Sequence, residues 1–312
     1  MLALARYSLK GPYQAAAIVG MLAIAAVFLP LLAGHSFFIV IVATVLTVMA
    51  SALVGLIILT QGTVSGLKAV VVSILGITLV TTLVLKTPTL GISIGLMQWL
   101  PIVILAQTLK STKSLTLMIL AGMGLALVAI AIQFIIWPDF EDRLLPVFHQ
   151  MFIALYDNPA LSSEKVGEYI QLLVHLMVLL LVPTLYLLFT GILLLSRSMQ
   201  ARLASSDGYQ QEFHALALGK PIALAALAIL ILGSWLDQDW ITSMAMAMMG
   251  AFLYQGIAVV HCKLATSKHR ALIIGIYYTL LIIFPQVVAV SSIGGMVDNW
   301  IVFRKNRNIE ST

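Results

Sequence analysis

The chain has 312 residues, of which 61% are hydrophobic and only 9% are charged, with a net charge of +5. A typical soluble domain is about 45–50% apolar and about 25% charged, so a soluble globular protein is excluded. The apolar runs are continuous, which excludes a membrane β-barrel with its alternating strands. The composition therefore predicts an all-α, polytopic transmembrane protein in the lipid bilayer, with no nucleic-acid partner.

The first apolar run follows a short basic N-terminus. It covers 13–33, is longer than the apolar part of a usual signal peptide, and has no clear small-x-small cleavage site. We therefore predict an uncleaved first span. Within it, Ala16 and Gly20 are small residues four positions apart, which suits close helix contact or docking of a partner subunit.

Further apolar runs approach the length of about 20 residues that a membrane span needs. The predicted spans are 13–33, 36–60, 66–85, 90–109, 114–137, 167–195, 220–236, 240–262 and 271–293. Two polar segments interrupt them, an external amphipathic segment at 138–166 and a cytoplasmic loop at 196–219. We predict a single membrane domain over 1–312 with nine spans, eight being the alternative.

The positive charges predict the orientation. If the N-terminus is cytoplasmic, the inner side holds Arg6, Lys10, Lys68, Lys110, Lys113, Arg197, Arg202, Lys220, Lys263, Lys268 and Arg270. The outer side then receives most of the carboxylates, as the positive-inside rule requires. We predict a multi-pass protein of the bacterial inner (cytoplasmic) membrane. Nine spans would place Arg304 outside and eight would place it inside, so the side of the C-terminal tail stays open.

The stretch "GLMQWLPIVIL" places polar and aromatic groups beside a proline inside a span. Gln98 and Trp99 precede Pro101, which removes a backbone hydrogen bond and frees a carbonyl group. Two interpretations are open. The stretch either faces a ligand, or it is a structural kink in which Gln98 bonds a neighbouring helix.

A second candidate element lies in "LLVHLMVLLLVPTLY". His175, Pro183 and Tyr186 fall along one helical stripe, where His175 either contacts a ligand or bonds a neighbouring helix. No Asp or Glu lies deep in a predicted span. This argues against a carboxylate proton relay, an acidic metal cage and an intramembrane hydrolase, so we predict no enzymatic activity, no metal and no cofactor.

Two later spans carry aromatic and amide side chains, and we predict that the last span is broken near Pro285 or near the Gly294–Gly295 pair. The candidate ligand-binding residues in them are Tyr254, Gln255, Tyr277, Tyr278 and Gln286. Aromatic groups beside broken helices line sites for small amphipathic ligands, but they also form ordinary belts at the membrane interface.

The closing stretch "GGMVDNWIVFRK" contains Gly295, Asp298, Trp300 and Arg304. Asp298 and Arg304 are six residues apart, so we expect each to meet another part of the protein or the interface rather than the other. Trp300 suits the headgroup level. We predict that the stretch anchors the last helix, with Arg304 bonding helix ends or lipid phosphate.

The external segment 138–166 contains a predicted amphipathic helix. Phe148, Met151, Phe152 and Leu155 fall on one face. The helix either caps a substrate entrance or lies passively on the surface. The chain has no nucleotide-binding motif of its own, so any energy coupling comes from a partner subunit or an ion gradient.

Several stretches carry a family resemblance: "TQGTVSGLKA", "QWLPIVILAQTLKSTKSLT", "LVPTLYLLFTGILLLSRSMQARL", "YQGIAVVH" and "GGMVDNWIVFRK". With them the chain resembles the YybS-like family of uncharacterised bacterial membrane proteins, which is distantly related to the substrate-capture subunits of energy-coupling-factor transporters. The resemblance implies that Ala16 and Gly20 pack against a coupling protein and that segment 36–60 or 138–166 covers a ligand. Gln61 departs from the family pattern, in which a basic residue often stands there, and this weakens the idea of an anion site at that turn.

These observations predict a small-molecule transport or substrate-binding membrane subunit without its own ATPase, for an unknown ligand. The alternative is a non-transporting scaffold or assembly factor whose helices pack against partner membrane proteins. The two differ in whether polar groups of the spans converge on one ligand-sized cavity.

Overall fold

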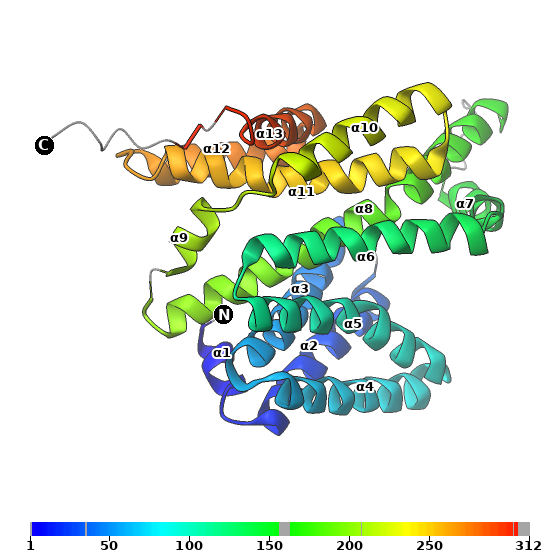
Figure 1. Cartoon of the computed structure of the whole chain (residues 1–312). Helices are drawn as coiled ribbons and strands as arrows, with labels where there is room; N and C mark the ends of the chain where they lie inside the picture. Colours follow the sequence, from blue (N-terminus) through cyan, green and yellow to red (C-terminus); the bar gives the residue numbers. More distant parts are fainter. Residues whose placement is uncertain (1, 35, 156–162, 207, 302, 305–312) are drawn as a thin grey trace, which may run out of the picture. The chain divides into compact units, whose positions relative to one another are not determined.

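The regular elements of the protein are all helical in the part of the chain that the structure describes. The structure, a computed structural model, describes residues 2–34, 36–155, 163–206, 208–301 and 303–304 (Figure 1). The predicted all-α class is confirmed over these ranges.

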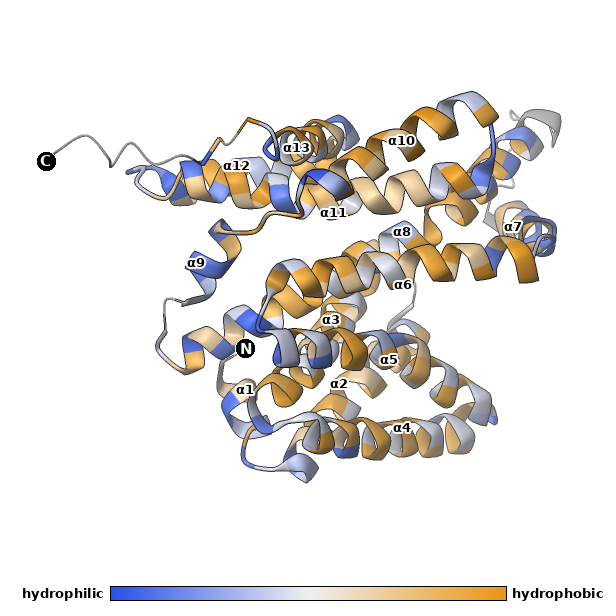
Figure 2. Cartoon of the chain, viewed as in Figure 1, coloured by the Kyte–Doolittle hydropathy of each residue, from blue (hydrophilic) through white to orange (hydrophobic). Residues whose placement is uncertain are grey.

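Seven of the described helices are long and apolar enough to cross a membrane. They are α2 (Pro12–Ala33), α3 (Phe37–Gln61), α4 (Thr63–Leu85), α5 (Pro88–Thr112), α6 (Leu115–Ile136), α8 (Ser163–Leu203) and α11 (Asp239–Lys263). Figure 2 shows them coloured mostly as apolar. Because lipid requires every backbone polar group to be satisfied within its own helix, these helices identify a multi-pass membrane protein.

Six shorter helices complete the described fold. They are α1 (Leu2–Ser8), α7 (Phe140–Leu155), α9 (Gly208–His214), α10 (Lys220–Leu236), α12 (Arg270–Ile283) and α13 (Pro285–Val297). The predicted segment 196–219 is therefore not a loop throughout. Helix α8 continues to Leu203, because no helix-breaking residue follows the apolar part of the span, and α9 forms within the remaining connection.

The chain divides into two compact units, each described here by itself. Unit 1 comprises residues 1–122 and 188–216, and unit 2 comprises residues 123–187 and 217–312. In unit 1, small residues allow neighbouring helices to approach closely. A Cβ on Gly91 of α5 would lie 2.6 Å from the Cα of Thr78 on α4, and one on Gly55 of α3 would lie 2.5 Å from Ser196 Oγ on α8.

The small residues of α2 pack inside unit 1. Ala16 and Gly20 are buried, the Ser73 hydroxyl of α4 donates to the Ala16 carbonyl oxygen at 3.1 Å, and a Cβ on Gly20 would lie 3.8 Å from the Ser73 Cα. A contact within the chain therefore takes up the face that the family resemblance assigns to a coupling protein.

In unit 2, helix α7 packs on the first part of α8. Phe140, Leu144, Leu145, Phe148 and Phe152 of α7 lie against a buried cluster on α8, which consists of Ile170, Val174 and Val178. The predicted amphipathic helix is present. Phe148 and Phe152 of its predicted apolar face pack on α8, whereas Met151 of that face is 52% exposed. The side chain of Leu155 lies outside the described part.

The last two helices are bent by 115° at a break between Ile283 and Pro285. Pro285 opens α13 at the position where a missing backbone N–H removes no helical hydrogen bond. Of the two predicted places for a break, Pro285 is confirmed, and α13 continues through Gly294 and Gly295. Within the described residues, the bent pair makes an eighth candidate span if it counts as one, and α10 is a shorter apolar helix of 17 residues.

Candidate functional site

The candidate ligand residues of α5 contact α3 within unit 1. The Gln98 amide donates to the Thr47 carbonyl oxygen at 3.1 Å and to the Ser51 hydroxyl at 2.7 Å. Trp99 is fully buried, and its Nε1 has no hydrogen-bond partner among the described residues. Pro101 lies inside α5, as predicted. These bonds agree with the interpretation in which Gln98 ties a kinked helix to its neighbour.

Candidate residues on α8 and α11 also bond neighbouring elements, here within unit 2. The Tyr254 hydroxyl donates to the Leu187 carbonyl oxygen, next to the buried Tyr186. Gln255 is fully buried and accepts a hydrogen bond from the Leu218 N–H at 3.0 Å. Pro183 lies inside α8. Tyr254 and Gln255 thus stabilise helix packing at these positions.

Of the three candidates on α12 and α13, two are paired. The Tyr277 hydroxyl donates to Ser291 Oγ at 2.9 Å, and Tyr278 Oη lies 3.0 Å from His261 Nε2. Gln286 is exposed. The predicted ligand residues are therefore distributed over both units, and most of them have a bond to a neighbouring helix. Their role in ligand binding stays a prediction.

His175 lies among carboxylates of unit 2. Its Nδ1 is 3.1 Å from Glu141 Oε2 on α7, and its Nε2 is 3.6 Å from Asp239 Oδ1 on α11. The bond to a neighbouring helix was one of two predicted interpretations, and the structure shows that the bonded partner is the carboxyl group of Glu141. Within the described residues, no group of three or more His, Cys, Asp or Glu side chains is arranged to hold a metal ion.

The closing stretch forms a network that we call the C-terminal clamp, consisting of Gln255, Asp298, Asn299 and Arg304. Asp298 is 4% exposed and accepts hydrogen bonds from Gln255 Nε2 at 3.0 Å and from Arg304 Nε at 3.1 Å. The expectation that Asp298 and Arg304 do not meet was wrong. The chain turns after α13, and the Phe303 N–H, which also donates to Asp298, marks that turn.

Asn299 extends the clamp to the beginning of α10. Its Oδ1 accepts from the Gly219 N–H at 2.9 Å, while its Nδ2 donates to the Met296 carbonyl oxygen at 2.9 Å. Trp300 is 43% exposed beside it, and its predicted place at the headgroups stays a prediction. The clamp therefore joins α10, α11 and the end of α13, and the predicted anchoring role of this stretch has a structural basis.

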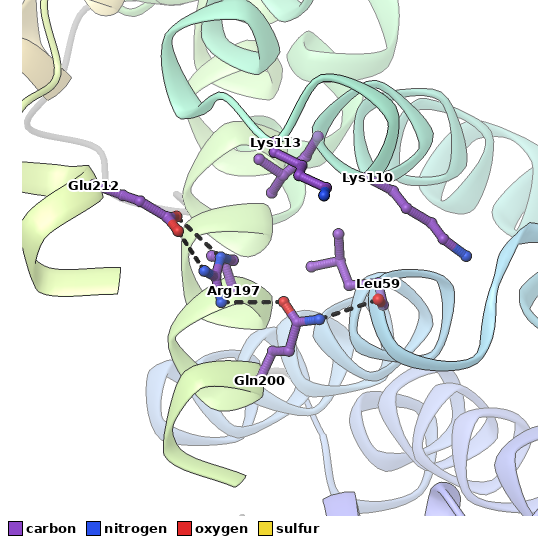
Figure 3. Close-up of a pocket in the computed structure, with 7 residues that line it drawn as sticks. Leu59, Lys110, Lys113, Arg197, Gln200 and Glu212 are labelled. Carbon is purple, nitrogen blue, oxygen red and sulfur yellow. Dashed lines mark hydrogen bonds and ion pairs between the residues drawn. The ribbon is translucent and has the colours of Figure 1, made fainter. Parts of the chain in front are cut away.

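A half-enclosed cavity of about 370 Å³ lies in unit 1, where the ends of α3 and α5 meet α8 and α9 (Figure 3). We call it the basic cavity; it is lined by Leu59, Leu109, Lys110, Lys113, Arg197, Gln200 and Glu212. Leu59 and Leu109 are buried. The volume lies in the range of about 300–1,000 Å³ that is typical of small-molecule sites.

Arg197 is held in place on one wall of the basic cavity. Its guanidinium pairs with the Glu212 carboxylate through two nitrogens, with Nε at 3.0 Å, and donates to Gln200 Oε1 at 3.2 Å. The Gln200 amide in turn donates to the Leu59 carbonyl oxygen at 3.0 Å. Figure 3 shows these bonds as dashed lines. Glu212 lies on one side of Arg197, and Lys113 and Lys110 lie on the opposite side.

The sequence predicted only part of this cavity. Lys110, Lys113 and Arg197 belong to the predicted basic side, but nothing in their spacing places them around one hollow. Gln200 and Glu212 were not predicted as site residues. Glu212 is one of two carboxylates in the 196–219 connection, so the sequence holds no signal that singles it out.

No family model, curated protein or solved structure matches the chain.

Proposed function

We propose that the protein is a bacterial inner-membrane subunit that binds a small molecule for transport and has no ATPase of its own. The basic cavity carries the proposal, because it is half-enclosed, has the volume of a small-molecule site, and combines an apolar floor with charged walls. The absence of a nucleotide-binding motif supports a dependence on a partner subunit or an ion gradient. The closing "GGMVDNWIVFRK" stretch supports membership of the YybS-like family.

Filling the cavity tests this function. We expect Leu109→Phe to expel a bound small molecule, because Leu109 lies on the buried floor and the larger ring occupies the hollow. Leu109→Met, which keeps the side-chain volume, is the matched control. Native mass spectrometry of protein extracted directly from membranes should find a small molecule in the wild type and in Leu109→Met, but not in Leu109→Phe. A wild-type protein without bound molecule, or equal retention in Leu109→Phe, contradicts the proposal.

A scaffold or assembly factor is the second candidate, and a specific observation favours it. Gln98, Tyr254 and Gln255 each bond a neighbouring element instead of facing an unfilled site. Polar bonds of this kind are packing devices in membrane helices. Stable co-purification of a membrane complex from which no small molecule is recovered would support the scaffold over the binding subunit.

We also propose that α12 and α13 form a re-entrant pair rather than a full span. The Gly219–Asn299 bond places the end of α13 beside the start of α10. The short 237–238 connection joins α10 to α11 at their other ends, so the 264–269 connection that leads to α12 lies at the same end as Gly219. Helix α12 spans only about 21 Å, less than the hydrocarbon thickness of about 30 Å.

With α10 as a span, this arrangement has eight crossings and puts Arg304 on the side of the basic residues Lys263 and Arg270, in agreement with the positive-inside rule. We expect green fluorescent protein fused after residue 312 to fluoresce, and alkaline phosphatase inserted after residue 238 to be active. Active alkaline phosphatase fused after residue 312 would exclude the re-entrant pair and support nine spans.

A further inference from the structure

We propose that the basic cavity binds the phosphate-type group of an anionic ligand and that Lys110 and Lys113 contact it. This deepens the proposed small-molecule function and rests on it. Three cationic side chains and one carboxylate line the cavity, which leaves the lining with a net charge of +2. A half-enclosed site surrounded by low-dielectric protein and lipid concentrates the field of such charges on its interior.

The only carboxylate among the lining residues is already engaged. Glu212 pairs with Arg197, and Gln200 holds the same guanidinium from the other side. Arg197 therefore forms a fixed wall whose charge is largely compensated. Neither Lys110 nor Lys113 has an ion pair or hydrogen bond of its side chain to another described residue. The ammonium groups of the two lysines therefore account for the uncompensated charge of the lining.

The positions of these lysines have a simpler partial explanation. Lys110 lies in the last turn of α5, and Lys113 is its left-handed C-cap, where cations stabilise the helix dipole. Lys86 occupies the same left-handed C-cap position on α4, with a φ of 58° against 52° for Lys113. Capping thus explains why a lysine follows each helix. It does not explain why Lys110 and Lys113 share a cavity with Arg197, which Lys86 does not line.

The backbone next to Lys110 also leaves room for its ammonium group. Gly62 links α3 to α4 with a φ of 104°, and a Cβ at this position would lie 2.9 Å from Lys110 Nζ. Any larger residue would displace the ammonium group. Gln61, whose neutral side chain argued against an anion site at this turn, donates instead to the Leu9 carbonyl oxygen. The positive charge beside the turn between α3 and α4 therefore comes from Lys110 of α5.

The buried floor defines the rest of the ligand. Leu59 and Leu109 add apolar side chains to the charged lining, so the ligand combines an anionic group with an apolar or organic body. Both a phosphorylated metabolite and an anionic phospholipid headgroup have this chemistry. Their shared phosphate group is what Lys110 and Lys113 recognise, and the test separates the two sources.

The test uses the full-length protein in phosphatidylcholine nanodiscs. Binding of inorganic phosphate is measured by calorimetry, and binding of phosphatidylglycerol is measured by native mass spectrometry. We expect at least one of these probes to bind the wild type, and the double variant K110Q/K113Q to weaken that binding about tenfold for each ammonium group lost. K86Q, with the same backbone geometry outside the cavity, should bind as the wild type does.

Phosphate binding without phosphatidylglycerol binding would identify a soluble anion, and the reverse would identify a lipid headgroup. Failure of both probes to bind the wild type, or equal binding by K110Q/K113Q and the wild type, would overturn the anion assignment. If Leu109→Phe still expels a bound molecule in that case, the proposed small-molecule function stands and only the ligand class is wrong.

Discussion

Asp298→Ala is expected to lower the free energy of unfolding of the protein by about 3–5 kcal/mol, the usual cost of removing one partner from a buried ion pair. The side chains of Asp298 and Arg304 are only 2% and 12% exposed, so the arginine charge left behind has little access to water. The same carboxylate accepts hydrogen bonds from Gln255 and from the Phe303 N–H. Its loss therefore releases the end of α13 from α11 and from the closing turn.

Thermal unfolding in detergent, followed by size-exclusion chromatography, measures this effect. Asp139→Ala is the control, because Asp139 is an exposed carboxylate of unit 2. We expect the melting temperature of Asp298→Asn to lie between those of Asp298→Ala and the wild type, since an amide oxygen still accepts a hydrogen bond from the Phe303 N–H. In the double variant Asp298→Ala/Arg304→Met, the loss of stability should be smaller than the sum of the losses in the two single variants. Equal melting of Asp298→Ala and Asp139→Ala would show that the clamp does not stabilise the fold.

Gly295→Ala is expected to destabilise the protein strongly, whereas Gly294→Ala is expected to be neutral or slightly stabilising. A Cβ on Gly295 would overlap the Phe252 carbonyl oxygen and lie 2.5 Å from the Gly256 backbone nitrogen. Backbone atoms of α11 cannot move aside as a flexible side chain can, so the two helices must separate. Overpacking of a close contact costs about 1–3 kcal/mol, and more when backbone must shift.

The neighbouring glycine provides the control. A Cβ on Gly294 would meet no heavy atom within 4 Å, and alanine there gains helix propensity worth about 1 kcal/mol. Gly256→Ala should resemble Gly295→Ala, because its Cβ would lie 2.8 Å from the Ser291 carbonyl carbon. The measurement is a comparison of the melting temperatures of the three variants in detergent. If Gly294→Ala and Gly295→Ala melt alike, α11 and α13 do not cross closely at these residues.

The Asp298 and Gly295 substitutions act on one assembly. Gly295 lets α13 approach α11, and this approach brings Asp298 to Gln255 and Asn299 to Gly219. We therefore expect Asp298→Ala to lower the free energy of unfolding only slightly further in a Gly295→Ala background, because the effects of substitutions within one network are not additive. The same assembly supports the proposed re-entrant pair, since it holds the end of α13 beside the start of α10.

Local chemistry made much of the fold predictable. Runs of apolar residues without charges predict membrane helices because the bilayer excludes unpaired backbone groups. Pro285 indicates one of the two predicted places for a break, because proline cannot donate a helical hydrogen bond. The amphipathic pattern around Phe148 and Phe152 predicts α7. Each of these inferences depends on neighbours within a few positions of the chain.

The candidate site was less predictable. An isolated polar residue such as Gln98 looks the same in the sequence whether it faces a ligand or bonds Ser51 on another helix. The same ambiguity applies to Asp298 and Arg304, whose separation of six residues does not reveal the turn that brings them together. Met151 shares the predicted apolar face of α7 with Phe148 and Phe152, but only those two pack on α8, a difference that the local pattern does not contain.

The sequence by itself determined that this protein is a bundle of apolar helices, because hydrophobicity and proline act within a single segment. Only the tertiary structure decided which polar groups meet. The basic cavity joins Leu59, Lys110 and Arg197 from three helices far apart in the chain, and the clamp joins Gly219 to Asn299. Such contacts depend on how helices cross at small residues such as Gly20 and Gly295, and the sequence shows these residues but not the helix that each one meets.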